Sequence, residues 1–317
     1  MRADDAYLSL RRSRSGHYSA QVDLYYQRAQ LRRSEVNTLD LLPPPGSHFD
    51  LSGSTQEQSS SEFNPRLGFK WQLADNQSLR VVAQKWRRPA SAGTLGAVDT
   101  LGIAVSDRLP TAGGLYQRAR LQYDRESGGT LFFQAFADRE RVDNGLAGQR
   151  TAITDFELTQ LESLRNRPEV FSPKPDLEET PTFAKGSVDT LGFAVNALLG
   201  ARHSASARLL LRDSRQQGAN DGLRVPYVPR SYLLLGGQWA GPERLLMGAT
   251  AIYRGSRFRD DSNLDPLRAG WSFGLTGYWE SADKRSTVQV ILDNLLSNTL
   301  AAVQPDPHLV LRYSLRF

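Results

Sequence analysis

The residue types that most often carry catalysis are few and scattered in this chain. Its four histidines, His17, His48, His203 and His308, stand far apart, and no two have the spacing of a metal-ligand pair. There is no nucleophile elbow, phosphate-binding loop or dinucleotide-binding glycine motif. The chain has no cysteine, which excludes disulfides and thiolate chemistry. The sequence therefore predicts no enzyme, no metal site and no cofactor.

One acidic cluster has the residue types of a calcium site. Asp260, Asp261 and Asp265 offer carboxylate oxygens, which are the ligands that calcium prefers. Their spacing is not that of an EF-hand loop. A solvated external loop is the favoured interpretation.

Basic residues at alternate positions suggest a different chemistry, the attraction of anions. If the polar positions of each alternating segment face a lumen, ten basic residues there stand against the four acids Asp23, Asp124, Asp138 and Asp293. Rings of arginine and lysine line anion-conducting pores, so such a lumen favours an anionic small molecule or polymer. The alternative is that these side chains bond across the wall and with loop carboxylates. The basic set is Arg66, Lys70, Arg80, Arg118, Arg120, Arg208, Arg212, Arg254, Arg312 and Arg316.

The candidate ligand contacts combine lumen positions with arginines of external loops. They are Arg66, Lys70, Arg80, Arg87, Arg88, Arg118, Arg120, Arg150, Arg208, Arg212 and Arg254. The formal charge of +5 and pI near 9.5 do not by themselves indicate nucleic acid. The arginines alternate along strands instead of forming a basic patch, so no nucleic-acid partner is expected.

The elements that position these residues are predicted from a period of two, which runs through the whole chain. In 66–73, for example, Leu67, Phe69 and Trp71 alternate with polar residues or glycine. Most such segments span about ten residues, the length that a tilted strand needs to cross a bilayer. About thirteen strands are predicted, near 6–12, 17–31, 64–73, 78–88, 115–124, 130–139, 188–198, 204–213, 230–239, 244–258, 269–280, 286–294 and 308–317.

The links between these strands alternate between short and long. Short turns are expected at 13–16, 74–77, 125–129, 199–202, 240–243 and 281–285. Long polar links are expected at 32–63, 89–114, 140–187, 214–229, 259–268 and 295–307. Outer-membrane barrels have short periplasmic turns and longer external loops. The fold class predicted is therefore all-β, an antiparallel transmembrane β-barrel.

Hydropathy is compatible with strands in lipid but not with membrane helices. The mean hydropathy is −0.46, and no apolar run approaches the ~18 residues that a spanning helix requires. Only alternate residues of a barrel strand face lipid, which keeps the mean low. Within 140–187, Thr154 and Glu157 have capping-box spacing before leucines at helical intervals, although a strand edge is the other interpretation of this segment.

The strand count suggests that the barrel is incomplete. If the last strand ends in the periplasm, the first predicted strand begins outside, whereas bacterial barrels have an even number of strands. The start of the chain also lacks the apolar core of a secretory signal, as expected either of a cytoplasmic protein or of a mature or truncated portion of a longer exported chain. We therefore expect residues 1–317 to be the C-terminal part of an outer-membrane barrel, with an N-terminal plug or repeat domain absent.

Three segments carry a resemblance to a known family. The end HLVLRYSLRF (308–317) resembles the assembly signal of Gram-negative outer-membrane barrels, with Leu309, Leu311, Tyr313, Leu315 and Phe317 at alternate positions. ILDNLLSN (291–298) is similar to a segment in the penultimate strand of TonB-dependent receptors. FNPRLGFKWQLADNQSLRVVAQKWRRP (63–89) looks like a hairpin of the same receptors, and resembles most those barrels that carry tetratricopeptide repeats upstream.

The resemblance implies an outer-membrane transport barrel, with lipid and the barrel-assembly machinery as partners. Ligand uptake through external loops and lumen is expected, with TonB as a partner only if an upstream plug exists. The sequence leaves two alternatives open, a passive pore that exports a polysaccharide or other polymer, and a surface β-sandwich that acts as a binding module.

Overall fold

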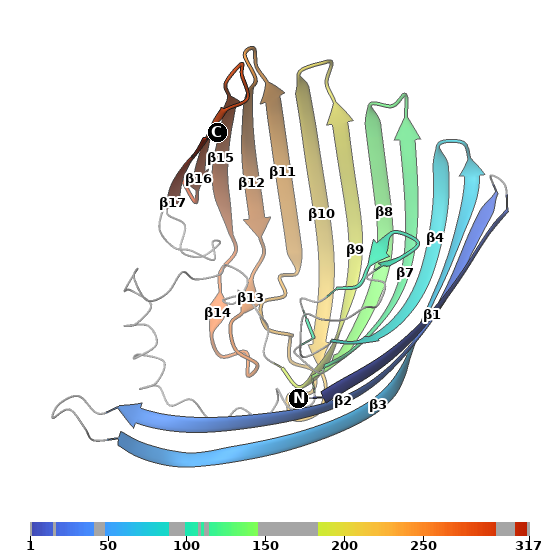
Figure 1. Ribbon diagram of the computed structural model, residues 1–317, viewed down its shortest axis with the longest axis vertical. Helices are drawn as coiled ribbons and strands as arrows, with labels where there is room; N and C mark the ends of the chain where they lie inside the picture. The colour runs from blue at the N-terminus through green and yellow to red at the C-terminus, as the bar shows by residue number, and fades with distance from the viewer. Residues whose placement is uncertain are drawn as a thin grey trace.

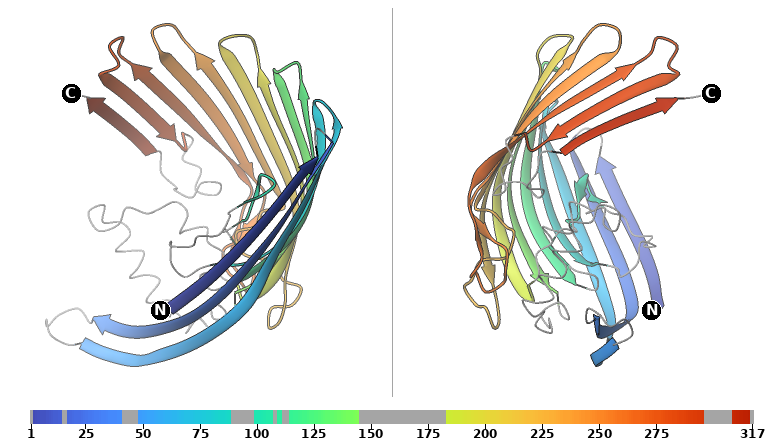
Figure 2. Two further views of the ribbon diagram at one scale, coloured as in Figure 1. Left: turned by 45° about the vertical axis from the view of Figure 1, so that its right-hand side comes forward. Right: turned by 90° about the vertical axis from the view of Figure 1, so that its left-hand side faces the viewer.

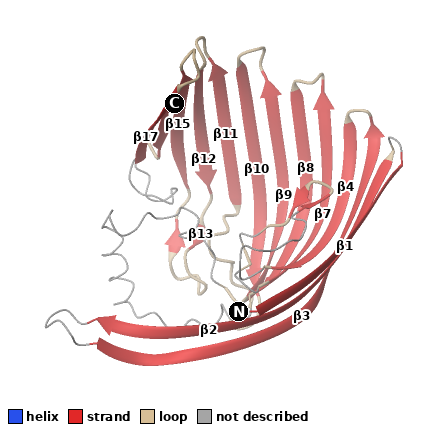
Figure 3. Cartoon of the chain, viewed as in Figure 1, coloured by secondary structure: helices blue, strands red, loops and turns tan. Residues whose placement is uncertain are grey.

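The computed structural model describes residues 2–14, 17–40, 48–88, 99–106, 109–110, 114–144, 183–295 and 308–315. All regular structure in these ranges is β-strand (Figure 3). None of their segments forms a helix that is long and apolar enough to cross a membrane.

Thirteen strands form one antiparallel sheet in which every strand lies beside its neighbours along the chain (Figure 1). This confirms the predicted number of strands and the up-and-down topology. The strands are β1 (Arg2–Arg14), β2 (Tyr18–Asp40), β3 (His48–Ala74), β4 (Gln77–Arg87), β7 (Leu115–Ser127), β8 (Leu131–Asp143), β9 (Lys185–Leu198), β10 (His203–Gln216), β11 (Ser231–Ala240), β12 (Leu245–Arg254), β15 (Gly270–Glu280), β16 (Ser286–Asp293) and β17 (His308–Leu315).

The sheet curves strongly but does not close on itself. Figure 2 shows it as an open trough, with β1 along one edge and β17 along the other. Because there is one curved sheet and not two packed ones, the β-sandwich alternative is wrong. Two small hairpins accompany the sheet, β5 (Asp99–Thr100) with β6 (Ile103–Ala104), and β13 (Arg257–Phe258) with β14 (Pro266–Leu267).

The two faces of the sheet differ as the period of two predicts. Cross-strand pairing places Asp23, Arg66, Gln84, Arg118 and Glu140 on one continuous row, on the concave face. The convex face carries exposed apolar side chains instead, among them Val22, Leu67, Phe69, Trp71, Val81, Leu121, Leu191, Leu211, Leu275 and Trp279. Such a band is unfavourable in water and favourable in lipid.

The ends of the sheet also differ. All the short turns lie at one end and the long connections at the other (Figure 1). In the turn between β7 and β8, Gly128 and Gly129 have φ of +59° and +66°, a conformation that glycine adopts without steric cost. The predicted alternation of short and long links is confirmed.

Some predicted strand boundaries are wrong, mainly where strands extend beyond the apolar band of the convex face. The polar stretch 32–63 was expected to be a loop, yet β2 and β3 stay paired through most of it, from Tyr18–Trp71 out to Asp40–His48. The ladder is held by backbone hydrogen bonds, which form whether or not one face of the strand pair is apolar. Similarly, β8 and β10 run a few residues beyond their predicted ends, while β12 ends at Arg254 and not at 258. The predicted helix near 154–164 lies outside the described residues.

Candidate ligand site on the concave face

A charge cluster from β7 and β8 forms the centre of the concave face. Arg118 donates from Nε to both carboxylate oxygens of Asp138, at 2.9 Å each, and also bonds through Nη2. Glu140 accepts a 2.7 Å bond from the Tyr116 hydroxyl, and its nearest oxygen lies 3.8 Å from Arg118 Nε. The side chains of Arg118 and Asp138 are only 8% and 4% exposed. A buried pair with several bonds holds its geometry because separating the charges is costly.

Arg120 lies beside this cluster in a different environment. Its guanidinium carbon stands 3.6 Å from the centre of the Phe136 ring, a cation–π contact. Its Nη1 is 3.7 Å from Asp138, and its Nε is buried without a hydrogen bond among the described residues. Gly192, opposite Phe136 on β9, makes room for the ring, since a Cβ there would lie 2.2 Å from Phe136 Cζ.

A second ion pair joins β4 to β7. Arg80 Nε donates to Asp124 at 2.8 Å, and the same carboxylate accepts bonds from Gln122 and Gln134 at 2.8 and 3.0 Å. Both carboxylate oxygens of Asp124 therefore accept hydrogen bonds from side chains of the same sheet.

The β5–β6 hairpin folds back onto this concave face (Figure 2). Arg80 and Arg118 donate to the backbone carbonyls of Leu101 and Ala104, at 3.0 and 2.9 Å. Gln84 donates to Thr100 Oγ1 and to the Ile103 carbonyl, at 3.1 and 2.9 Å.

The hairpin also bonds to β2 and packs against a glycine of β3. Gln21 accepts a 3.0 Å bond from the Leu101 amide. Gly68 lets the hairpin approach the wall, because a Cβ there would lie 2.8 Å from Thr100 Cγ2 and 2.9 Å from Leu101 Cδ1. Polar wall residues thus satisfy much of the hairpin's backbone, as a buried loop requires.

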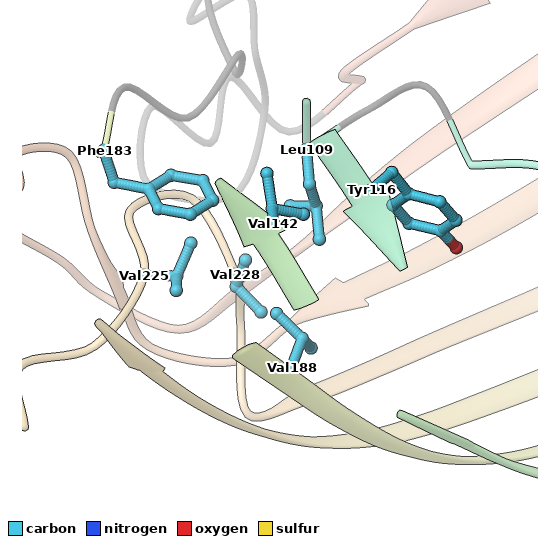
Figure 4. Close-up of a cluster of buried hydrophobic side chains, with 7 residues drawn as sticks. All are labelled: Leu109, Tyr116, Val142, Phe183, Val188, Val225 and Val228. Atoms are coloured by element: carbon cyan, nitrogen blue, oxygen red, sulfur yellow. The ribbon is translucent and has the colours of Figure 1, made fainter. Parts of the chain in front are cut away.

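A small apolar core anchors the loop end of the same wall. Figure 4 shows its members gathered from several connections and from β7, β8 and β9. They are the buried side chains of Leu109, Tyr116, Val142, Phe183, Val188, Val225 and Val228. Burial of these side chains fixes the described parts of three long connections against the concave side.

A cavity of about 410 Å³ lies between the 99–106 segment and the wall. Its volume is in the range of roughly 300–1,000 Å³ that is typical of small-molecule sites. Five of the predicted ligand contacts line it, namely Arg80, Arg118, Arg120, Arg208 and Arg212. Its carboxylates are Asp138 and Glu140, and its apolar lining includes Ile103, Leu109, Phe136, Val188, Leu210 and Val228.

The remaining predicted contacts lie elsewhere. Arg66 is buried on the row of Asp23, and Lys70 lines a separate cavity near the short turns. Arg87 bonds to Glu62, Arg88 donates to the Pro110 carbonyl at 2.8 Å, and Arg254 ends β12. Arg150 is outside the described residues. The structure thus brings together five of the eleven candidates.

Four contributors to the site were not predicted. Gln84 and Tyr116 are polar or aromatic residues without any motif, and Glu140 was placed at the start of a predicted loop. Phe136 belongs to a segment with aromatic residues on both faces, so its orientation could not be inferred from alternation. One sequence signal could have indicated this charge cluster. Arg118 and Arg120 alternate in one predicted strand, and acids follow in the next strand, β8.

The acidic loop with Asp260, Asp261 and Asp265 is stabilised by hydrogen bonds within the loop. Asp260 accepts bonds from the amides of Leu264 and Asp265, at 3.0 and 2.8 Å, so its carboxylate organises its own turn. Across the part of the chain that the structure describes, no three histidines or carboxylates are grouped to hold a metal.

Comparison with solved structures identifies the architecture. The chain superposes on the ferric yersiniabactin uptake receptor FyuA from Yersinia pestis with a TM-score of 0.64, over 99% of this chain and 45% of that one, at 12% identity. The siderophore receptor PiuA from Acinetobacter baumannii superposes with a TM-score of 0.61, over 99% of this chain and 43% of that one, at 12% identity. The ferric-catecholate import receptor Fiu from E. coli K12, in its closed form, superposes with a TM-score of 0.60, over 99% of this chain and 44% of that one, at 12% identity.

The fold is that of a TonB-dependent receptor barrel. This confirms, at the level of fold, the resemblance that the sequence motifs indicated. The receptor-barrel fold accounts for the curved meander, for the apolar convex face and for the charged concave one. The chain spans less than half the length of each of these receptors. No protein-family model and no curated protein sequence matches it.

Proposed function

We propose that this chain is part of an outer-membrane transport barrel of the TonB-dependent-receptor type. The observation that carries the proposal is the division of the sheet into an apolar convex face and a hydrogen-bonded, charged concave face. A sheet in lipid needs the first, and a lumen that passes polar solutes needs the second. A catalytic role has no comparable support, because the largely buried carboxylates of Asp138 and Glu140 already accept hydrogen bonds from Arg118 and Tyr116.

The open edges of the sheet support a larger barrel. Unpaired backbone amides and carbonyls in lipid each cost several kcal/mol, so spanning sheets close on themselves. We propose that further strands pair with β1 and β17 in the membrane. On the convex face of β17, Leu309, Leu311, Tyr313 and Leu315 are exposed by 46–70%, as the proposed assembly signal requires. Phe317 lies outside the described residues.

The proposed transport follows from the arrangement of the connections. Ligand would be captured at the end of the sheet that carries the long connections and would then pass along the concave face. FyuA is named as an uptake receptor and Fiu as an import receptor, which supports uptake over export. Coupling to TonB would require a plug, and the barrel-assembly machinery and lipid would be the other partners.

The membrane part of the proposal is tested by electrophoresis of the chain purified from outer membranes in detergent. A barrel domain migrates faster unheated than after boiling, because it stays folded in the loading detergent. We expect this heat-modifiable migration and resistance to carbonate extraction. A chain that is folded and monomeric in plain buffer would contradict the proposal.

The transport part is tested in cells with the gene disrupted. Uptake of radiolabelled iron complexes with catecholate and carboxylate chelators should fall for one class and be restored by the intact gene. Collapse of the proton-motive force should abolish the same uptake. Unchanged uptake together with loss of a surface polymer would support the export pore instead.

A further inference from the structure

We propose that the β5–β6 hairpin is a hinged flap, which lifts from the concave face while the large sheet stays folded. In the docked position it covers part of β3 and β4 and narrows the proposed lumen. Lifted, it would open this part of the wall to solutes. The inference rests on the proposed transport function only for the use of the flap, because the movement is a property of the hairpin and the wall alone.

The first observation is how the hairpin is attached. It forms a two-stranded sheet of its own, apart from the large sheet. Among the described residues, five hydrogen bonds join it to the wall, and a wall side chain takes part in each of them. These side chains are Gln21, Arg80, Gln84 and Arg118. Lifting the hairpin therefore breaks no backbone ladder of the large sheet.

Most of these wall side chains keep other partners when the hairpin leaves. Arg80 stays bonded to Asp124, and Arg118 stays bonded to Asp138. Gln21 also bonds to one side chain of β1 and to another of β2, at 3.0 and 2.7 Å. Because the wall remains hydrogen-bonded without the hairpin, the undocked state leaves few polar groups unsatisfied.

Gln84 is the exception, since its described bonds go only to the hairpin. Its Nε2 donates to Thr100 Oγ1 and to the Ile103 carbonyl, at 3.1 and 2.9 Å. Its Oε1 has no hydrogen-bond partner in the described structure. Gln84 is therefore the wall residue whose removal weakens docking without breaking a bond within the wall.

The hairpin depends on the wall for its own conformation. β5 and β6 pair at only two positions, and so short a hairpin is unstable alone in water. Its turn residues, Leu101 and Gly102, have φ of +50° and +78°, a region that is unfavourable for leucine. In the docked state, wall side chains bond to both the amide and the carbonyl of Leu101. Folding and docking of the hairpin are therefore coupled, so that it opens as one unit.

The side of the hairpin that faces away from the wall is open. Asp99, Gly102 and Ala104 are exposed, whereas Leu101 and Ile103 are only 8% and 4% exposed. The buried residues face the wall and the exposed ones face the inside of the trough (Figure 2). Lifting the hairpin therefore displaces no other described element.

The hinge is the segment 109–110, which follows the hairpin along the chain. Leu109 belongs to the apolar core at the loop end of the wall, and its carbonyl accepts a 3.3 Å bond from Asn144 Nδ2. Arg88 Nη1 donates to the Pro110 carbonyl at 2.8 Å. None of these contacts involves the hairpin, so the hinge stays fixed when the hairpin lifts.

The test measures how fast buried thiols react with a maleimide in the full chain, purified in detergent. The chain has no cysteine, so Ile103→Cys, Val82→Cys and Leu109→Cys report singly on the hairpin, the wall beneath it and the hinge. Val82 is 1% exposed and pairs with Gly68, against which the hairpin packs. Ile103→Cys and Val82→Cys should react at rates within about threefold of each other, because one opening exposes both. Leu109→Cys should react at least tenfold more slowly.

Gln84→Ala should raise the rates of Ile103→Cys and Val82→Cys together, at least tenfold, and leave Leu109→Cys unchanged. Gln134→Ala is the matched control, because Gln134 lies on the same face and its described bond goes to Asp124 and not to the hairpin. It should leave all three rates within twofold.

Three results would overturn the flap. Equal rates at all three positions would mean that the whole wall opens. Protection of Val82→Cys while Ile103→Cys reacts would mean that the hairpin does not cover the wall, and no reaction at either position would mean that it never lifts. Heat-modifiable migration of each variant separates these outcomes from failure of the proposed function: a chain that keeps it without the predicted rates loses only this inference, not the proposed barrel.

Discussion

At the scale of single residues, the concave face is organised by charge pairs between neighbouring strands. Arg118 and Asp138 combine several bonds with side chains that are less than a tenth exposed. Arg139 and Asp189, on the convex face of β8 and β9, are 3.6 Å apart and about half exposed. An arginine–aspartate pair is therefore expected to contribute very different amounts to the free energy of unfolding at these two positions.

Asp138→Asn should lower the free energy of unfolding by up to about 3–5 kcal/mol, because it removes the carboxylate that bonds to the buried Arg118 and leaves only Glu140, 3.8 Å from Arg118 Nε, as a counter-charge. Asp189→Asn, the matched control, should cost no more than about 1 kcal/mol, because Arg139 and Asp189 are half exposed and lie beyond Ala137 and Leu191, at the end of the apolar band toward the long connections. Urea titration of the chain in lipid vesicles, followed by tryptophan fluorescence, measures both. Equal effects of the two substitutions would show that the Arg118 pair is as solvated as the exposed one.

Gly192→Ala should also destabilise the wall, because the new Cβ would overlap the Phe136 ring on which Arg120 rests. Overpacking of this kind costs roughly 1–3 kcal/mol. Gly237→Ala, in β11, meets no atom within 4 Å and should be close to neutral. The same titration compares them, and an unchanged midpoint for Gly192→Ala would mean that the ring moves freely.

Alternation along the sequence predicted the face of the sheet on which Arg118 and Arg120 lie, but not what surrounds them. Alternation places Arg118 and Arg120 on the polar face, and the structure puts them there. It cannot show that Phe136 faces the same side, because Phe132 and Phe133 put apolar residues on both faces of the segment. Contacts such as the stacking of Arg120 on Phe136 depend on the register of two strands, which alternation within one strand does not encode.

At the scale of elements, the main feature is the hairpin that returns to the concave face. Its docking depends on Gly68, whose lack of a side chain admits Thr100 and Leu101. Nothing in the composition of the polar link 89–114 distinguishes it from an ordinary external loop. The long β2–β3 ladder was not predicted for a related reason, since backbone pairing between polar segments leaves no apolar pattern.

Gly68→Ala should displace the hairpin from the wall. Because the chain has no cysteine, a single Ile103→Cys substitution reports on this directly. Ile103 is 4% exposed, so the thiol should react slowly with a maleimide, and at least tenfold faster when Gly68→Ala is added. Gly237→Ala in the same background should leave the rate unchanged. Fast labelling without Gly68→Ala would contradict the docked hairpin.

At the scale of the whole molecule, the central claim is that the convex face meets lipid. Strand number, the order of the strands and the alternation of short and long links were predictable from the sequence, because each follows from local patterns. The openness of the sheet and its curvature were not, since they depend on pairings between whole strands. The apolar band of the convex face is the property that supports the proposed place of the molecule in a membrane.

Leu121→Arg should destabilise the folded chain in vesicles by about 2–4 kcal/mol, as a basic side chain does near the middle of a lipid-facing strand. Leu121 is 47% exposed on the convex face of β7. Ser206→Arg, on the concave face of β10, should cost far less because the side chain enters the lumen. Comparable losses would indicate that both faces meet the same medium.

The most direct test of the central claim is cysteine scanning of six consecutive positions on β10, from Ser204 to Leu209, in outer membranes. The account predicts that a membrane-impermeant maleimide labels the three even positions, which face the lumen. It also predicts that the three odd positions are protected and react instead with a lipid-soluble reagent. Uniform labelling of all six positions by the impermeant reagent, or the reverse alternation, would contradict it.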